Sequence, residues 1–175
     1  MAEGVGQVPV VTIVGRGDSG KTTFLEKLIR ELTDRGVRVA TVKHHVHDYD
    51  IDIPGKDSWR HARAGAVATM VSSPEKFALV RRVDREMTLD ELTRVALDAG
   101  ADLLLAEGFK RQGANPIEVL RGACSSQLVT SAEALLALVT DVPETAPGVQ
   151  HFALDDAAGV ADLIEARFLG AVGEA

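Results

Sequence analysis

One run of residues near the N-terminus constrains the fold of this chain more than any other. Residues 15–22 read Gly-Arg-Gly-Asp-Ser-Gly-Lys-Thr, which fits the pattern G-x-x-x-x-G-K-[ST] of a phosphate-binding loop. The apolar residues 8–14 before it predict a buried strand, and residues 21–35 after it predict a helix. The motif requires this context, so we interpret the run as the phosphate-binding loop of a nucleoside triphosphatase.

The residue types of this loop suit phosphate binding. Glycines let successive backbone N–H groups point inward at phosphate oxygens, and the helix N-terminus adds partial positive charge. We expect Lys21 to reach the terminal phosphates and serve catalysis, and the hydroxyl of Thr22 to ligate Mg²⁺. The predicted nucleotide-binding residues are Gly15, Gly17, Asp18, Ser19, Gly20, Lys21, Thr22 and Thr23.

Length, charge and cysteine content limit the class of protein. The 175 residues predict a single nucleotide-binding domain over 1–175, with residues 1–7 as a disordered tail. The net charge of -7 argues against a nucleic-acid partner, and no apolar run approaches the roughly 18 residues of a membrane helix. Cys124 stands alone and cannot form an internal disulfide, so we expect a cytoplasmic protein and assign this thiol no catalytic role.

Apolar runs alternate with amphipathic segments along the chain. This order predicts an α/β fold, the three-layer sandwich of P-loop nucleoside triphosphatases with a mainly parallel sheet. The runs 66–71 and 77–83, separated by five residues, predict an added antiparallel hairpin. The very hydrophobic run 101–106 predicts a central strand. Further strands are expected at 37–42, 117–120 and 135–140, and further helices from the capping box at 88–91 to Gly100 and after Asp155 or Asp156.

Glu107 follows the hydrophobic run 101–106 directly. Ligands of open α/β sheets bind at the carboxyl ends of the strands, so we expect this carboxylate to lie beside the phosphate-binding loop. There it would hold the metal or a metal-bound water, which makes Glu107 a predicted catalytic and metal-binding residue. Gly108 would let the following loop approach the terminal phosphate closely.

Residues 43–57 form a segment rich in His and Asp that follows the second predicted strand. Three interpretations remain open. The imidazoles and carboxylates would suit a transition-metal site. Alternatively the segment is a switch loop in which Asp50 or Asp52 supplies another Mg²⁺ ligand, or it is a polar surface loop.

These segments together resemble a known family. Residues 41–60, the triplet 64–66 and residues 101–110 (ADLLLAEGFK) resemble the signatures of the molybdopterin-guanine dinucleotide biosynthesis adaptor (MobB-like) proteins. The helix start GKTTFL at residues 20–25 fits the same family. The resemblance extends from about Val10 to Asp141, and the combination is more specific than the phosphate-binding loop alone.

The resemblance implies a GTP-binding, Mg²⁺-dependent homodimer with weak GTPase activity. It would assist molybdopterin guanylyltransferase, the enzyme that attaches GMP to molybdopterin. Carried over to this chain, Thr22, Asp52 and Glu107 are the expected metal ligands, with Asp50 next after Asp52. The chain contains no Asn-Lys-x-Asp motif, so the preference for guanine rests on the resemblance alone; Thr140-Asp141 is either a base contact or a polar pair at a strand end.

Two other functions remain open at this stage. One is an ATP-dependent small-molecule kinase or ligase of the dethiobiotin-synthetase type. The other is a nucleotide-driven metallochaperone that would use His44, His45 and His47. The predicted hairpin, residues 66–83, is our candidate for the homodimer interface, because its first strand is more continuously apolar than an exposed edge strand should be.

Overall fold

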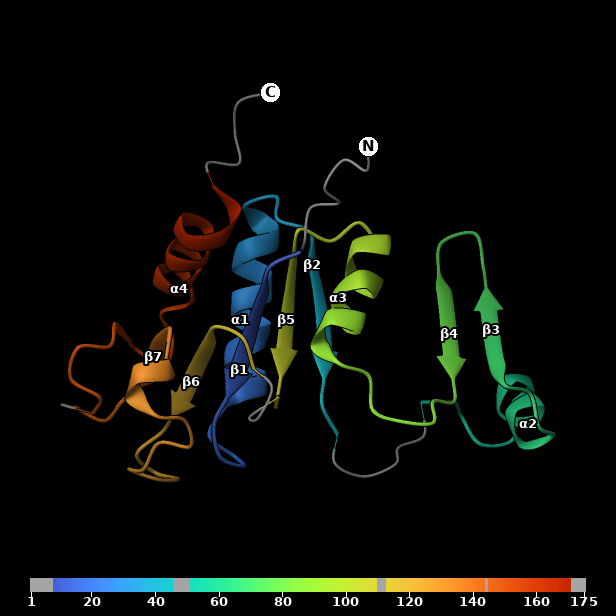
Figure 1. The fold of residues 1–175 in the computed structure, drawn as a ribbon, viewed down its shortest axis with the longest axis horizontal. Coiled ribbons are helices and arrows are strands. Elements are labelled where there is room, and N and C mark those ends of the chain that lie inside the picture. The colour runs from blue at the N-terminus through green and yellow to red at the C-terminus, as the bar shows by residue number, and fades with distance from the viewer. Residues whose placement is uncertain (1–7, 46–50, 110–112, 144, 171–175) are drawn as a thin grey trace. The chain divides into compact units, whose positions relative to one another are not determined.

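The computed structural model describes residues 8–45, 51–109, 113–143 and 145–170 (Figure 1). Residues 1–7, predicted as a disordered tail, lie outside the described residues. The chain divides into two compact units: unit 1 comprises Met1–His44 with Leu89–Ala175, and unit 2 comprises His45–Thr88. This division into compact units does not test the expected single domain over 1–175, which stays a prediction.

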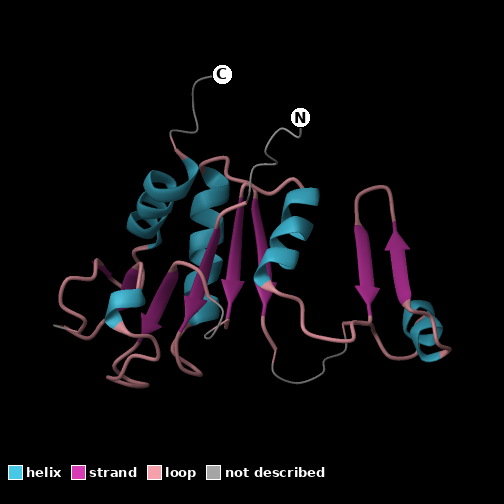
Figure 2. Ribbon diagram, viewed as in Figure 1, coloured by secondary structure: helices cyan, strands magenta, loops and turns pink. Residues whose placement is uncertain are grey.

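Unit 1 is built on a six-stranded sheet with the strand order β2-β5-β1-β6-β7-β8. All its pairings are parallel, which confirms the predicted α/β class (Figure 2). β5 lies between β2 and β1 and is buried throughout, so the hydrophobic run forms an internal strand as expected. The strands are β1 (Val10–Val14), β2 (Val39–Lys43), β5 (Leu103–Glu107), β6 (Pro116–Leu120), β7 (Ala137–Thr140) and β8 (His151–Phe152).

Helices cover both faces of this sheet. α1 (Lys21–Asp34) and α4 (Ala157–Ile164) pack on one face, and α3 (Leu89–Asp98) packs on the other. Side chains alternate along each strand, so Leu103 joins the cluster of α1 and α4 whereas Leu104 packs with residues of α3. This arrangement confirms the predicted three-layer sandwich. Two short segments complete unit 1: a 3-10 helix, Ala132–Ala134, and a π-helical segment after α4, Glu165–Leu169.

Unit 2 contains one short helix and a two-stranded sheet. α2 (Asp57–Arg63) precedes the strands β3 (Ala68–Ser72) and β4 (Phe77–Arg81), which pair antiparallel. The predicted hairpin is therefore confirmed, with its strands about one or two residues shorter than expected. Met70 pairs with Leu79 and both are exposed. The exposed large apolar residues of unit 2 are Ile51, Ile53, Val67, Met70, Val71, Phe77, Leu79 and Val83.

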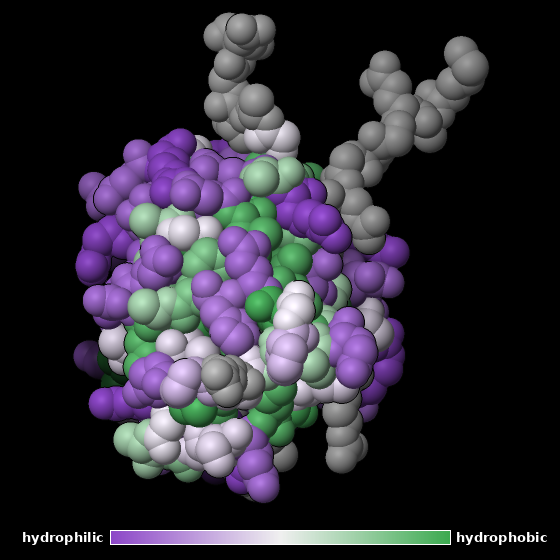
Figure 3. Space-filling view, turned by 90° about the vertical axis from the view of Figure 1, so that its left-hand side faces the viewer, coloured by the Kyte–Doolittle hydropathy of each residue, from purple (hydrophilic) through white to green (hydrophobic). Residues whose placement is uncertain are grey.

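None of the helices in the described part of the chain is long and apolar enough to cross a membrane. Figure 3 shows one face of the molecule, on which hydrophilic and hydrophobic residues are interspersed. Most of the large apolar residues that are exposed belong to unit 2; among the described residues of unit 1, only Val95 is of this kind.

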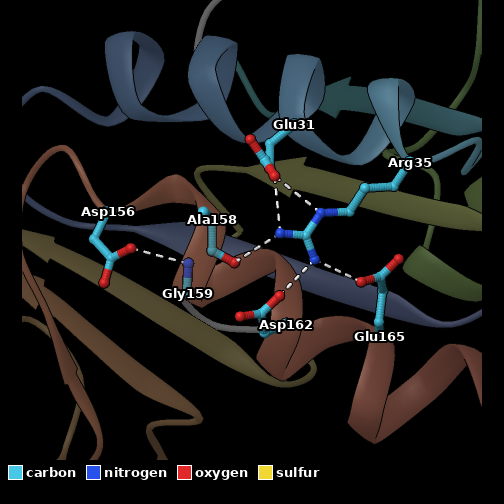
Figure 4. Close-up of polar contacts among 7 residues, drawn as sticks. All are labelled: Glu31, Arg35, Asp156, Ala158, Gly159, Asp162 and Glu165. Carbon is cyan, nitrogen blue, oxygen red and sulfur yellow. Dashed lines mark hydrogen bonds and ion pairs between the residues drawn. The ribbon is translucent and has the colours of Figure 1, made fainter.

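The side chain of Arg35 joins α1 to α4 and the π-helical segment (Figure 4). Its guanidinium donates to Asp162 and Glu165 at 2.6 Å each and to Glu31 Oε1 at 2.8 and 2.9 Å. Hydrogen bonds with Asp162, then Glu165 and Glu31, raise the pKa of Arg35 above its ordinary value. Beside this cluster, Asp156 accepts the backbone N–H of Gly159 at 2.9 Å and caps α4, which confirms the predicted cap.

Replacing Arg35 should loosen the docking of α4 on α1. We expect Arg35→Met to lower the free energy of unfolding by about 1–2 kcal/mol, because charge-assisted hydrogen bonds are lost while Asp162 stays exposed to water. Arg30→Met is the matched control, since Arg30 lies exposed on the same helix. Urea titration measures both variants, and equal stabilities would contradict the assigned role of Arg35.

Arg38 and Asp102 fasten the start of β2 to the start of β5. Asp102 accepts the backbone N–H of Arg38 at 2.9 Å and its Nε–H at 3.0 Å. The hydrogen bond from the Arg38 side chain lowers the pKa of Asp102 below its ordinary value, although partial burial opposes the shift. The charged carboxylate is thus favoured in the folded state, and its contribution to stability is present above the unfolded-state pKa.

This lowered pKa gives a pH-dependent prediction. The difference in unfolding free energy between wild type and Asp102→Asn should be constant near neutral pH. It should decrease as the pH falls below the ordinary value of 3.8 and through the lower folded-state pKa, because the wild-type carboxyl group then becomes protonated. Urea titrations at several pH values measure this difference, and a difference that grows on acidification would contradict the assignment.

Candidate functional site

The loop between β1 and α1 is held in a conformation that leaves its backbone open to a ligand. Gly15 has φ 145°, and a Cβ atom there would lie 2.5 Å from the carbonyl oxygen of Val119 on β6, so only glycine fits. Gly20, with φ 89°, is the N-cap of α1, and no side chain caps the helix there. The first backbone N–H groups of α1 therefore stand where an anion binds favourably.

Ser19 supplies a buried polar group inside this loop. It is only 2% exposed, and its Oγ has no hydrogen-bond partner among the described residues. A buried hydroxyl without a partner is unfavourable, and a bound phosphate oxygen is an acceptor that would satisfy it. The residues present thus fit a phosphate group at this loop.

Thr22 and Glu107 meet at the carboxyl edge of the sheet. Thr22 Oγ1, in the first turn of α1, donates to Glu107 Oε1 at 3.1 Å. Glu107 ends the buried strand β5 and is only 8% exposed, so its carboxylate is held in one direction. Mg²⁺ is usually bound by one or two carboxylates together with substrate phosphates, so these oxygens fit the ion. Their roles as metal ligands stay predictions.

The three charged residues of the loop contact neighbouring backbone and side-chain atoms. Lys21 Nζ donates to the carbonyl oxygen of Arg16 at 2.5 Å, and Arg16 Nη2 donates to Gln127 Oε1 at 3.3 Å. Asp18 has a left-handed backbone with φ 58°, and Cys124 Sγ donates to its carbonyl oxygen at 3.1 Å. Residues 121–130, which follow β6, thus contact the phosphate-binding loop through Gln127 and Cys124.

A buried acid that was not among the residues predicted for the site holds this second loop. Glu118 on β6 is fully buried, and its carboxylate accepts the N–H groups of Val129 at 2.8 Å and Thr130 at 3.0 Å. The sequence does carry a signal, since Glu118 is an acid inside the apolar run 117–120. A carboxylate in such a strand needs internal donors, and it finds them in the loop that follows.

The structure locates the other residues predicted for the site, but their geometry gives them no role in binding a ligand. Gly17 and Thr23 are exposed, at the tip of the loop and in the first turn of α1. Asp141 accepts the backbone N–H of Gly122 at 2.6 Å, so it also braces the loop after β6. A contact of Thr140 or Asp141 with the base stays a prediction.

Asp52 lies in unit 2, where its Oδ1 accepts a hydrogen bond from Ser58 Oγ at 3.0 Å. Its role as a metal ligand stays a prediction. His47 and Asp50 fall in residues 46–50, outside the described part of the chain. Within the described ranges, no group of three His, Cys, Asp or Glu residues could hold a metal ion, and the ring of His44 lies 5.1 Å from that of Phe109.

Lys43, which was not among the predicted site residues, also lies at this edge of the sheet. Lys43 ends β2 directly beside Glu107, and its Nζ lies 3.8 Å from Glu107 Oε1. The site therefore draws its side chains from the ends of β2 and β5, the first turn of α1 and the loop after β6.

Comparison with known proteins agrees with this geometry. The family model described as "Molybdopterin guanine dinucleotide synthesis protein B" matches residues 10–141. A molybdopterin-guanine dinucleotide biosynthesis adapter protein of Haemophilus influenzae is 37% identical over 137 residues, covering 78% of this chain and 77% of that protein. The Escherichia coli protein of the same name is 35% identical over 162 residues, covering 90% of this chain and 91% of the relative.

Solved structures show the same fold. The crystal structure of Bacillus subtilis MobB superimposes with a TM-score of 0.73 at 29% sequence identity, covering 91% of this chain and 98% of that one. The resemblance found in the sequence is thereby confirmed, because the family model, the relatives and the fold agree. This chain belongs to the family of the molybdopterin guanine dinucleotide synthesis protein B.

Proposed function

We propose that this protein is a GTP-dependent adapter in the biosynthesis of molybdopterin-guanine dinucleotide. The observation that carries the nucleotide part of the proposal is the loop from Gly15 to Lys21. Its first position admits only glycine, and the buried hydroxyl of Ser19 has no hydrogen-bond partner among the described residues. The adapter part is supported by relatives that carry this name and share most of their length with the chain. The proposed setting is the cytoplasm.

Residues of unit 1 have distinct roles in this proposal. Backbone N–H groups of the loop and of the first turn of α1 bind the phosphates, together with Gly17, Asp18, Thr22 and Thr23 of the predicted set. Lys21 contacts the terminal phosphates, and Thr22 and Glu107 hold Mg²⁺, which neutralises charge on the phosphate oxygens when bound. Asp52 is proposed as a further ligand.

Hydrolysis is proposed to be slow. Phosphoryl transfer needs charge stabilisation and a positioned nucleophile. The residues identified in unit 1 bind phosphate and stabilise charge, and none of them is assigned to positioning the attacking water. Guanine as the base is part of the proposal through the family, since the adapter relatives are named for a guanine dinucleotide pathway.

The proposed partners are a second copy of this chain and molybdopterin guanylyltransferase. The support for a homodimer is the hairpin of unit 2, where Met70, Phe77 and Leu79 lie on one face of the two-stranded sheet and are 53–67% exposed. Neighbouring apolar side chains exposed in this way favour burial against another protein surface.

The nucleotide-binding role is tested by calorimetry with GTP, GDP and ATP in the presence of Mg²⁺. We expect guanine nucleotides to bind selectively and Lys21→Ala to weaken GTP binding about 10- to 100-fold, the usual loss for a hydrogen bond to a charged group. Lys27→Ala, which removes an exposed lysine from the same helix, should leave the affinity unchanged. Equal or tighter binding of ATP would favour the kinase or ligase alternative instead.

The dimer is tested by placing charge on the apolar face of the hairpin. Met70→Glu together with Leu79→Glu should convert a dimer to a monomer at micromolar concentration, because buried like charges oppose association. Lys76→Glu, in the loop between the two strands, is the control and should remain dimeric. Sedimentation velocity measures the state, and a wild type that is monomeric at micromolar concentration would overturn the interface.

A further inference from the structure

Lys43 lies at the end of β2, beside the predicted metal ligand Glu107. Lys43 on β2 and Glu107 on β5 are direct neighbours in the parallel register. Every second residue of a strand points to the same face of the sheet, so Lys43 shares a face with Val39, four positions earlier. Val39 packs against the buried cluster that includes the apolar residues of α1. By the same alternation Glu107 shares its side with Leu105. Both side chains thus lie on the face of the sheet that carries α1 and the phosphate-binding loop.

The contact between Lys43 and Glu107 adds little to the stability of the fold. Stability therefore does not explain why a lysine lies beside this carboxylate. Nζ and Oε1 are 3.8 Å apart, beyond hydrogen-bond distance, and the side chain of Lys43 is 59% exposed. Ion pairs of this kind contribute little to folding. The same Oε1 atom already accepts the hydroxyl of Thr22 at 3.1 Å. The ammonium therefore stands at the predicted metal site with its charge still accessible.

Two other cations of the described part of the chain, Lys21 and Arg16, belong to the phosphate-binding loop and contact different groups. Lys21 Nζ donates to the carbonyl oxygen of Arg16, and the guanidinium of Arg16 contacts Gln127 in the loop after β6. β6 flanks β1 on one side and β5 flanks it on the other. Lys43 therefore supplies positive charge on the β5 side, where Thr22 and Glu107 lie.

The phosphates of a nucleotide are the groups that the ammonium of Lys43 would contact. In loops of this type the Ser or Thr hydroxyl is a ligand of the nucleotide's metal ion, so Thr22 and Glu107 would hold the metal and the terminal phosphate would lie on their side. A lysine at that side can donate to the γ-phosphate oxygens, and GDP lacks this group. We propose that Lys43 is a terminal-phosphate contact through which the protein distinguishes GTP from GDP. This inference rests on the proposed function.

The test compares affinities for a non-hydrolysable GTP analogue and for GDP. Full-length wild type, Lys43→Ala, Lys43→Arg and Lys27→Ala are titrated calorimetrically in saturating Mg²⁺. Lys43→Ala should weaken the GTP analogue about tenfold and GDP less than about twofold, because only the triphosphate offers the γ-phosphate. Lys43→Arg should keep most of the affinity, and Lys27→Ala should change neither ligand. Thermal unfolding of Lys43→Ala should match wild type, since the side chain is mostly exposed.

The outcomes separate this inference from the proposed function. If wild type binds both nucleotides and Lys43→Ala weakens both equally, or weakens neither, Lys43 does not contact the terminal phosphate, and the nucleotide-binding function stands. Equal weakening would instead indicate that Lys43 only positions Glu107 and its metal. If wild type binds neither nucleotide, the proposed function fails and the inference fails with it.

Discussion

Parallel pairing of β1 with both β5 and β6 brings three strand ends to one edge of the sheet, and the site is made from these ends and the loops that follow them. Alternation along β5 places Glu107 on the same face as Leu105, where Thr22 in the first turn of α1 donates to it. Pairing of β2 with β5 then places Lys43 beside it. The geometry of the site is therefore a consequence of strand register more than of any single interaction.

Close packing between β1 and β6 adds a second requirement. The carbonyl oxygen of Val119 approaches Gly15 so closely that a side chain would collide with it, which keeps the phosphate-binding loop against β6. Glu118, the preceding residue, is buried and binds the backbone of the loop after β6. Adjacent residues of one strand thus position two loops that contact each other at the sheet edge. Burial of this carboxylate is tolerated because each of its oxygens accepts a backbone N–H group.

The sequence predicted those parts of the site that depend on local rules. The loop motif needs glycine, lysine and threonine at fixed spacing, and Glu107 could be placed because carboxyl ends of parallel strands meet. Lys43 could not be assigned, because the sequence does not reveal the register of β2 against β5, and a shift of one residue would turn Lys43 to the other face. Gln127 and Cys124 were missed because their loop has no periodic pattern that predicts its path.

Unit 2 is inserted into unit 1 directly after the end of β2. The chain leaves unit 1 after His44 and returns at Leu89, so residues 45–88 continue directly from the strand that carries Lys43. His44 is fixed to β5, since its N–H donates to the carbonyl oxygen of Glu107 at 2.9 Å and its ring contacts Phe109. A ligand that contacts Lys43 or Glu107 would therefore contact the residues next to His44, the last residue of unit 1 before unit 2. If the proposed nucleotide site and the proposed dimer interface are coupled, linkage requires the coupling to be reciprocal, so that dimerisation changes nucleotide affinity by the same factor as nucleotide changes dimer affinity.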